Sequence, residues 1–348
     1  GGSSVATTEK IITIAKRLIE RKKTNPKIVV VVSAMGDTTD DYISLAKEIT
    51  DTPDKRELDV LMSTGEMISA SLLAMSLKSM GCDAISYNAY QLDIQTSGTH
   101  GKSLIDDIDV SKIEKSLDEG KIVVVTGFQG LDDIGDITTL GRGGSDTSAV
   151  ALAVKLNGKC EIYTDVDGIY FTDPRKFKEA KKLEEIEYEE MLELASLGAQ
   201  VMHSRSIELA QKYQIELYVG LSCSDIKGTY IRGMKNMKLE DKVITGLATS
   251  DDDVAITIDI DEEKIVDLFE SIANENISMD MISQTAPMNS KITVSFTIPK
   301  EDLVKAKEIV SKYVLKNKII IDENITKLSL VGLGMKHTSG VASKVFNI

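Results

Sequence analysis

The chain has 348 residues, a formal net charge of −14 and three cysteines. A chain of this length can bury a large core and predicts more than one domain. The acidic balance argues against a nucleic-acid-binding surface. Any anionic substrate must therefore be held by a few local cations and by backbone N–H groups.

The apolar runs and the cysteine spacing argue against a membrane protein, a disulfide-bonded protein and a cysteine metal site. The longest obvious apolar run, Ile28–Val32, is far shorter than the roughly 18 residues of a membrane span, and no secretory signal opens the chain. Cys82, Cys160 and Cys223 lie far apart in apolar-looking stretches and match no disulfide or metal spacing. We therefore expect a cytoplasmic protein with reduced thiols and no membrane partner.

The first two thirds of the chain alternate between apolar strands and helical patterns. Strands are expected at 28–33, 121–126, 160–164 and 216–220, and helices at 7–22, 66–80, 146–156, 188–196 and 204–213. This alternation predicts an α/β domain over 1–236 with a mostly parallel central sheet, whose ligands bind beyond the carboxyl ends of the strands. Three polar, glycine-bearing segments follow strands: SAMGDTTD (33–40), TGFQG (126–130) and TDVDGIYFTDPR (164–175).

The pattern changes after residue 236. Alternating strands at 254–260, 277–283, 292–298 and 318–321, with helices at 265–272 and 303–313, give the order βαββαβ of a ferredoxin-like unit over 243–322. A strand at 328–331 followed by a helix predicts the start of a second, incomplete unit over 323–348. One larger, irregular α+β domain is the alternative.

The segment LGRGGSDTSAVALAV (140–154) places Arg142 in a glycine-rich loop before an apolar helix. Gly141, Gly143 and Gly144 permit tight turns or close ligand approach. The residues 145–147, Ser-Asp-Thr, are of the types that cap helix N-termini, where N–H groups favour an anion. Taken alone, a well-capped structural loop is the simpler interpretation.

Two further segments carry chemical groups, each with a structural alternative. In 164–175 the glycine spacing excludes an EF-hand loop. Tyr170 can stack on a base and Arg175 can reach phosphates, although Asp-Gly and Asp-Pro also form ordinary turns. In STGE (63–66), Glu66 is expected at a helix start, where it binds a substrate ammonium or only complements the helix dipole.

The chemical inventory as a whole suits phosphoryl transfer. His100, His203 and His337 lack a nucleophile nearby in sequence, and no zinc spacing occurs. Hydroxyl groups, one arginine, one glutamate and amide-rich turns are instead expected at one edge of the sheet. Phosphoryl transfer needs positioning and charge stabilisation more than covalent side-chain chemistry.

Six ordered motifs make the chain resemble the aspartokinases, a family of amino-acid kinases. They are GGSSVA, VVVVSAMGDTTD, STGE, GRGGSDTSAVALA, TDVDGIYFTDPR and GAQVMHSRSIELA. The resemblance implies a three-layer α/β/α sandwich followed by ACT units. It also implies transfer of the ATP γ-phosphoryl group to the side-chain carboxylate of L-aspartate, the first step toward lysine, threonine and methionine.

The resemblance further implies roles for individual residues. Arg142 would grip an aspartate carboxylate, Glu66 would take its ammonium, and Asp146 would organise the transferring phosphate through a lysine or Mg²⁺. The aspartate-binding motifs also contain Ser33, Thr39 and Ser145. The nucleotide would contact Gly1, Gly2, Ser3, Ser4, Thr164, Asp165, Gly168, Tyr170, Arg175, Gln200 and Val201.

The chain departs from the family pattern at several positions. The family usually opens with Lys-Phe-Gly-Gly or Lys-Tyr-Gly-Gly, so we expect a lysine to precede Gly1. Gln200 replaces a common lysine, which would weaken a nucleotide contact, and Ser204 stands where proline is usual. The second ACT unit lacks its last strands, so further residues are expected there too.

In this family ACT units bind end-product amino acids, so lysine, with or without threonine, is the expected inhibitor, and a homodimer or higher oligomer is expected. Met279, Asp280 and Gln284 form a candidate effector lip, with an ordinary amphipathic strand as the alternative. Two other functions stay open at this point. They are an amino-acid kinase acting on glutamate, acetylglutamate or carbamate, and a non-catalytic amino-acid sensor built on a kinase fold.

Overall fold

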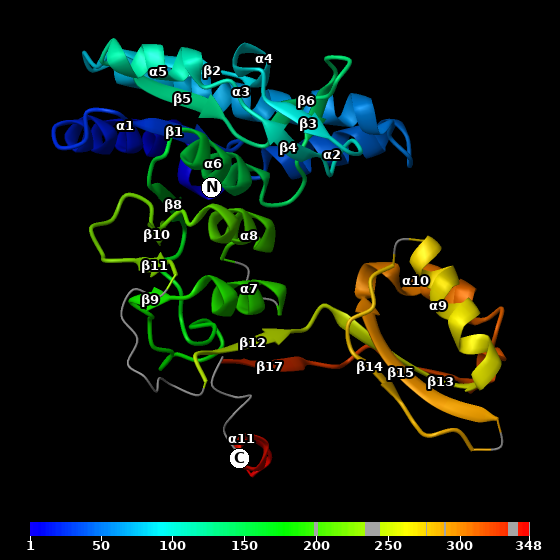
Figure 1. Cartoon of the computed structure of the whole chain (residues 1–348). Coiled ribbons are helices and arrows are strands. Elements are labelled where there is room, and N and C mark those ends of the chain that lie inside the picture. Colours follow the sequence, from blue (N-terminus) through cyan, green and yellow to red (C-terminus); the bar gives the residue numbers. More distant parts are fainter. Residues whose placement is uncertain (198–200, 234–243, 276, 289, 333–339, 348) are drawn as a thin grey trace. The chain divides into compact units, whose positions relative to one another are not determined.

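The computed structural model describes residues 1–197, 201–233, 244–275, 277–288, 290–332 and 340–347 (Figure 1). The chain divides into two compact units. The first comprises Gly1–Gly246 with Val331–Ile348, and the second comprises Leu247–Leu330. The domain borders expected from the sequence at 236, 243 and 322 stay predictions.

The first unit is built around a parallel sheet with the strand order β1-β5-β2. Its strands are β1 (Val29–Val32), β5 (Ile122–Thr126) and β2 (Ala84–Tyr87). All five residues of the central strand β5 are buried, and its four apolar residues alternate between two apolar clusters. Ile122 and Val124 pack with α1 (Thr8–Lys22) and α3 (Lys55–Ser79). Val123 and Val125 pack with α5 (Ser111–Asp118) and α6 (Gly144–Lys155). The expected α/β/α sandwich is confirmed.

A second sheet of this unit has the order β8-β10-β11-β9. Its strands are β8 (Cys160–Thr164), β10 (Leu217–Leu221), β11 (Thr229–Ile231) and β9 (Glu185–Ile186). Strand β10 runs parallel to β8 and antiparallel to β11. Helices α7 (Tyr188–Ser196) and α8 (Ser204–Tyr213) have the bounds that the sequence predicts.

The sequence patterns missed several elements of the first unit. A third sheet of order β4-β3-β6-β7 is made of strands only three or four residues long, below the length at which alternation is visible. These strands are β3 (Gln95–Ser97), β4 (Leu104–Asp107), β6 (Gln129–Leu131) and β7 (Ile137–Thr139). The missed helices are α2 (Thr38–Ile49), α4 (Ala89–Leu92), α5 and the 3₁₀ turn η1 (Gly2–Val5).

Helix α3 corrects the expectation that Glu66 stands at a helix start. The helix begins at Lys55, where the Asp54 side chain accepts a hydrogen bond from the backbone N–H of Glu57. STGE therefore lies in the middle of the helix. Gly65 is needed there for packing, because a Cβ at this position would lie 2.7 Å from the Cβ of Ala34.

Helix α3 is also, among the described residues, the one helix long and apolar enough to cross a membrane by length and composition. Half of its most apolar stretch is buried inside the protein, and its buried residues include Asp59, Ser63 and Glu66. These features are typical of a helix in the core of a domain. The helix contains no long uninterrupted apolar run, because polar residues divide its apolar stretch.

The second unit has the predicted βαββαβ order, and its antiparallel sheet has the order β14-β15-β13-β16. Its elements are β13 (Asp253–Asp261), α9 (Ile265–Asn274), β14 (Ile282–Gln284), β15 (Lys291–Pro299), α10 (Leu303–Val310) and β16 (Ile319–Asp322). Alternate residues of β13 and β15 form one core with both helices. The strand expected at 277–283 is wrong in extent, because β14 begins at Ile282.

The segment expected to begin a second regulatory unit contains β17 (Lys327–Val331) and α11 (Val341–Phe346). Strand β17 pairs with β12 (Gly246–Ser250). The turn GLGMKHTSG expected between strand and helix lies mostly at 333–339, outside the described residues.

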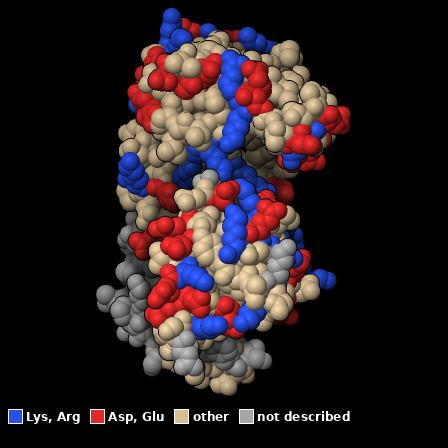
Figure 2. Space-filling view, turned by 90° about the vertical axis from the view of Figure 1, so that its right-hand side faces the viewer, with Lys and Arg blue, Asp and Glu red and all other residues tan. Residues whose placement is uncertain are grey.

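Surface charge and thiols complete the description. On the face drawn in Figure 2, the described Lys and Arg side chains are interspersed with Asp and Glu. Cys82 and Cys160 are buried as expected, whereas Cys223 is exposed, so the expectation of an apolar setting is wrong for that residue. All three thiols are free.

Candidate active site

The carboxyl ends of β1 and β5 lie side by side, with Val32 opposite Thr126. Residues directly beyond these ends approach other elements closely. Gly2 of η1 accommodates the loop after β1, since a Cβ on it would lie 2.8 Å from the carbonyl oxygen of Gly36. The turn after β5 packs on α6, since a Cβ on Gly127 would lie 2.9 Å from the Cβ of Ser145.

A cavity of about 610 Å³ lies between the facing edges of β1 and β8, with α1 and α6 also lining it. Five of the residues expected in the site line this cavity: Gly1, Ser4, Ser33, Ser145 and Asp146. These five residues come from segments that are distant in sequence, whereas Glu66 and Arg142 are not among the residues that line the cavity. The cavity extends along both strands, from residues that precede them to Ser33 beyond the carboxyl end of β1. Only this last part lies where α/β folds bind ligands.

Glu66 is 2 % exposed, and its Oε1 accepts a hydrogen bond of 2.9 Å from the backbone N–H of Ala34. Its Oε2 is buried with no partner among the described residues. Burial raises the pKa of the Glu66 carboxyl to about 7, although the backbone hydrogen bonds oppose this rise. The buried hydroxyls of Ser4 and Thr126 likewise have no hydrogen-bond partner within the described part of the chain.

The loop that carries Arg142 has two positions that require glycine. Gly141 and Gly143 have φ angles of 77° and 69°, a region that disfavours other residues. Both also contact neighbouring segments, because added Cβ atoms would lie 2.7 Å from the Gly101 oxygen and 2.2 Å from the His203 Cβ. The Arg142 side chain is exposed, and no hydrogen bond or ion pair joins it to the described residues.

Helix α6 begins directly after this loop, with Gly143 at the N-cap position and no side-chain cap. The expectation that residues 145–147 cap the helix is therefore wrong, because the helix starts at Gly144 and those residues lie in its first turn. Asp146 is half-buried there. Burial raises the pKa of its carboxyl, while the ring of His203 opposes the rise.

The expected nucleotide residues lie along the loop after β8. Gly168 has a φ of 145°, and an added Cβ would lie 2.7 Å from the Thr229 hydroxyl, so glycine is required there. Tyr170 donates a hydrogen bond to Asp167 at 2.9 Å. The Arg175 guanidinium, 82 % exposed, pairs with Asp173 at 2.9 Å within the same loop.

The other members of the nucleotide set are placed as follows. The Thr164 hydroxyl donates to the carboxylate of exposed Asp165 at 3.0 Å. Ser3 is exposed, and its carbonyl accepts a hydrogen bond from Lys10. Val201 is half-buried, and Gln200 lies outside the described residues. Thr39 is half-buried in the first turn of α2.

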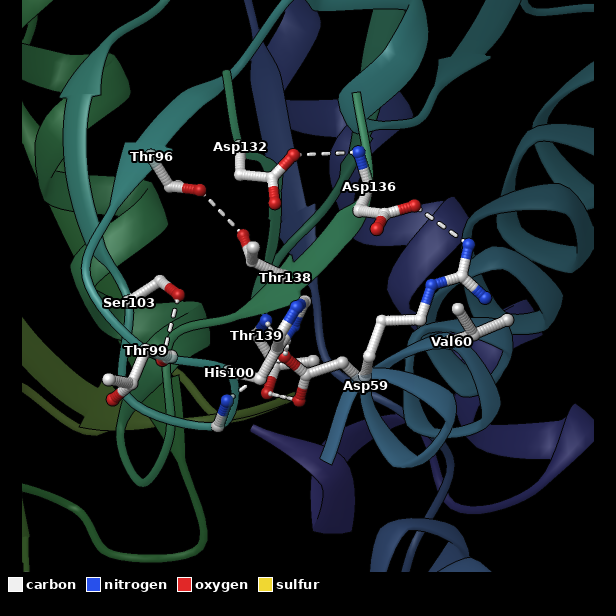
Figure 3. Close-up of polar contacts among 12 residues, drawn as sticks. Asp59, Val60, Thr96, Thr99, His100, Ser103, Asp132, Asp136, Thr138 and Thr139 are labelled. Carbon is white, nitrogen blue, oxygen red and sulfur yellow. Dashed lines mark hydrogen bonds and ion pairs between the residues drawn. The ribbon is translucent and has the colours of Figure 1, made fainter. Parts of the chain in front are cut away.

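One group of side chains could hold a metal ion on geometric grounds. His100, Asp132 and Asp136 offer ligand atoms within 4.8 Å of one another. The guanidinium of Arg56, however, already pairs with Asp136 at 2.7 Å. Asp132 accepts a hydrogen bond from the backbone N–H of Asp136 (Figure 3) and another from that of Ile134. These contacts give the cluster a structural role in the β6–β7 turn.

Comparison with known proteins identifies the family. The amino acid kinase family model matches residues 1–220, and an ACT domain model matches residues 265–313. The chain is 44 % identical to an aspartokinase of Geobacillus stearothermophilus over 353 residues, which cover 100 % of this chain and 86 % of that protein. It is 41 % identical to the aspartokinase of Corynebacterium glutamicum, over 99 % of this chain and 84 % of that one.

The chain belongs to the aspartokinase family. It is accordingly an enzyme of amino-acid biosynthesis that phosphorylates aspartate with ATP. The full-length match is to aspartokinases rather than to other amino-acid kinases, and it argues against a non-catalytic sensor.

Solved aspartokinase structures share the fold. E. coli aspartokinase III in complex with aspartate and ADP superposes with a TM-score of 0.82 at 24 % identity, covering 100 % of this chain and 90 % of that one. The aspartate kinase of Synechocystis has a TM-score of 0.60 at 37 % identity, covering 100 % of this chain and 61 % of that one.

Two residues that were not among the predicted site residues hold the backbone before Arg142. Asp59 lies outside the six motifs, and Arg205 lies within the last of them. Asp59 and Arg205 both bind backbone atoms of the segments that precede Arg142. The only sequence signal for Asp59 is an acidic residue in the apolar part of α3, seven residues before Glu66 and therefore on the same helix face.

Proposed function

We propose that this aspartokinase binds L-aspartate between Glu66 and Arg142. The supporting observation is the buried Glu66 carboxylate, whose Oε2 has no partner among the described residues. Leaving a buried carboxylate oxygen unpaired is costly, and a substrate ammonium would satisfy it. The exposed guanidinium of Arg142 is free to form two parallel hydrogen bonds with a carboxylate of the same substrate.

Hydroxyl groups at the strand ends would complete this pocket. Ser33 and Ser145 line the cavity between β1 and β8, whose lining does not include Glu66 or Arg142. Thr39 lies in the helix that follows the loop after β1. Uncharged donors of this kind orient a carboxylate without adding net charge. They would therefore position the side-chain carboxylate of aspartate for attack.

ATP would lie along the loop after β8, with its phosphates toward η1. Gly1 and Ser4 line the cavity beside Asp146, and Tyr170 offers a ring for the base. Ser3, Thr164, Asp165, Gly168, Gln200 and Val201 stay predicted contacts. For Arg175 to reach a phosphate it must leave its pair with Asp173, and an exposed pair of this kind is worth only about 0–1 kcal/mol.

The reaction needs no general base in the chain. A free aspartate side chain has a pKa of about 3.9 and is ionised at neutral pH. Its oxygen forms the new bond to the γ-phosphorus as the bond to the ADP oxygen breaks, which gives aspartyl phosphate and ADP. The protein's task is to hold two anions in line and stabilise the charge on the transferring group.

Mg²⁺ suits the donors at this end of the cavity. Asp146 supplies one carboxylate there, and Mg²⁺ is usually held by one or two carboxylates together with substrate phosphates and water. When bound, the ion would neutralise charge on the phosphates. Asp146 would hold it, and the raised pKa that burial gives this carboxyl would fall as the cation binds.

Regulation by an amino acid such as lysine, with or without threonine, would involve the ACT-type unit. A solved structure of E. coli aspartokinase III contains both lysine and aspartate. In this chain Asp280 is half-exposed and pairs with Lys327, which also pairs with Asp253 at 3.3 Å. An effector ammonium would take the place of Lys327 on Asp280. Met279, packed against the unit's core, and exposed Gln284 would contact the same effector.

We also propose a homodimer or higher oligomer in the cytoplasm. Strand β14 is an edge of its sheet, and Met281 and Ile282 there are 60 % and 50 % exposed. An apolar sheet edge of this kind is a surface that a second chain can cover.

An acceptor screen tests the proposed substrate. The protein is incubated with Mg-ATP and aspartate, glutamate, acetylglutamate or carbamate, with and without lysine, and acyl phosphate is trapped as hydroxamate. We expect product from aspartate and a lower yield with lysine. Product from another acceptor but not from aspartate would contradict the proposal. The variant Arg142→Ala should lose aspartate use while retaining ATP binding.

A further inference from the structure

The side chain of Asp59 is 1 % exposed and accepts four hydrogen bonds (Figure 3). Its Oδ2 accepts from the backbone N–H groups of Gly101 and Thr139, each at 2.9 Å, and lies 2.9 Å from His100 Nδ1. Its Oδ1 accepts from the Thr139 hydroxyl at 2.6 Å. A buried carboxylate that accepts hydrogen bonds from the backbone of two segments and from a threonine hydroxyl connects those segments to its own helix.

These bonds connect the two parts of the proposed aspartate pocket. Asp59 and Glu66 lie two turns apart on the same face of α3. Thr139 is the last residue of β7, three residues before Arg142. Gly101 in turn contacts the Arg142 loop, because its carbonyl oxygen would lie 2.7 Å from a Cβ on Gly141. Asp59 thus ties the helix carrying Glu66 to the loop carrying Arg142.

Arg205 of α8 holds the same two segments from another direction. Its guanidinium donates to the carbonyl oxygens of Leu140 at 2.9 Å and Ser103 at 2.7 Å. The backbone directly before Arg142 is therefore bound by Asp59 through Thr139 and by Arg205 through Leu140. Without Asp59, one of these two attachments is lost and the other remains, so the loop would shift rather than unfold.

We propose that Asp59 is a positioning residue for aspartate recognition, setting the separation of Arg142 from Glu66. The inference rests on the proposed roles of those two residues. The ammonium and the carboxylate of the substrate are a fixed distance apart, so binding both depends on the separation of Glu66 and Arg142. A displacement of about 1 Å at a positioned group can cost two orders of magnitude in rate.

The test compares Asp59→Ala and Asp59→Asn with the control Asp132→Asn. The control removes charge from another aspartate that accepts two backbone N–H groups, in the turn between β6 and β7. We expect Asp59→Ala to raise the KM for aspartate about ten-fold or more while the KM for ATP stays within two-fold. Asp59→Asn keeps an acceptor for the backbone N–H groups and should recover most of this loss, and Asp132→Asn should change neither KM.

A double-mutant cycle separates positioning from general destabilisation. If Asp59 acts through Arg142, Asp59→Ala should add little to the KM for aspartate in an Arg142→Ala background. Equal effects of Asp59→Ala on both KM values, or fully additive effects in the cycle, would overturn the inference. If Asp59→Ala does not fold, Thr139→Val removes only the hydroxyl donor and should still raise the aspartate KM several-fold. No change in that variant would also overturn the inference.

These outcomes are distinct from failure of the proposed function. If Arg142→Ala and Glu66→Gln leave the KM for aspartate unchanged, the proposed pocket is wrong. If both raise it and Asp59→Ala does not, the pocket stands and only the positioning role fails.

Discussion

Replacing Glu66 with glutamine tests whether this carboxyl is buried without a partner. The variant should change the free energy of unfolding as well as the activity. The pKa of this carboxyl rises from an ordinary 4.5 to about 7 because the side chain is buried. At about 1.4 kcal/mol per pH unit, this rise corresponds to about 3 kcal/mol of unfavourable free energy for ionised Glu66 in the folded protein. Glutamine has nearly the same shape and carries no charge, so it avoids this cost.

The sign of the pH dependence follows from the direction of the pKa change. Between pH 4.5 and 7 the folded protein binds this proton more tightly than the unfolded chain does. The stability of the unmodified protein should therefore fall as pH rises through this window and level off above pH 7. Glu66→Gln lacks this contribution, so its stability advantage should grow from near zero at pH 4.5 to about 3 kcal/mol at pH 8.

Denaturant unfolding of both proteins in the absence of substrates, at pH values from 5 to 8, measures this difference. A difference that stays constant across the range would refute the assignment of a buried, unpaired carboxylate. The affinity for aspartate should depend on pH in the opposite direction to the stability, because the substrate ammonium binds the ionised form of Glu66. Aspartate affinity should therefore increase as pH rises toward 7 in the unmodified protein, and saturating aspartate should lower the pKa of Glu66.

The effect of Glu66→Gln on the KM for aspartate can be checked against a control variant. Loss of a charged hydrogen bond of about 1.5–3 kcal/mol should raise the aspartate KM of Glu66→Gln about ten- to a hundred-fold with little change in the KM for ATP. Glu190→Gln removes the charge of another buried glutamate, in α7, and should leave the aspartate KM unchanged. Equal KM changes for both substrates in Glu66→Gln would contradict its proposed contact with the ammonium.

Three further predictions follow from the geometry. Arg142→Lys keeps the charge but not the two-pronged donor, so the aspartate KM should rise about ten-fold in steady-state assays, and an unchanged KM would contradict bidentate binding. Gly65→Ala places a Cβ 2.7 Å from that of Ala34, so the free energy of unfolding should fall by about 1–3 kcal/mol in a denaturant titration. The control Gly158→Ala has open space around the added Cβ and should leave the free energy of unfolding nearly unchanged. Asp280→Ala should raise the half-inhibitory concentration of lysine about ten-fold at unchanged activity without lysine, and equal inhibition would remove Asp280 from the effector site.

Periodicity determined the layered architecture well. The run from Ile122 to Val125 is apolar at every position, which marks a strand covered on both faces. The nine-residue strands β13 and β15 carry an apolar residue at every second position, and these residues form one buried face. Hydrophobic periodicity does not reveal short elements. Strands β3 and β6 have three residues each, too few to show an alternation of apolar and polar residues. The local patterns also misplaced the start of α3, because Gly65 resembles a loop signal while serving close packing inside the helix.

The amino-acid sequence by itself predicted which residues carry the chemistry, because the motifs place Glu66, Arg142 and Asp146 in recognisable local patterns. Only the tertiary structure decided how deeply each is buried. Glu66 in mid-helix has a buried, unpartnered oxygen, whereas Arg142 is exposed on its loop. It alone revealed Asp59, whose four hydrogen bonds join residues 59, 100, 101 and 139. Burial and long-range hydrogen bonds depend on which distant segments pack together in the folded protein. Local sequence patterns do not show which segments these are.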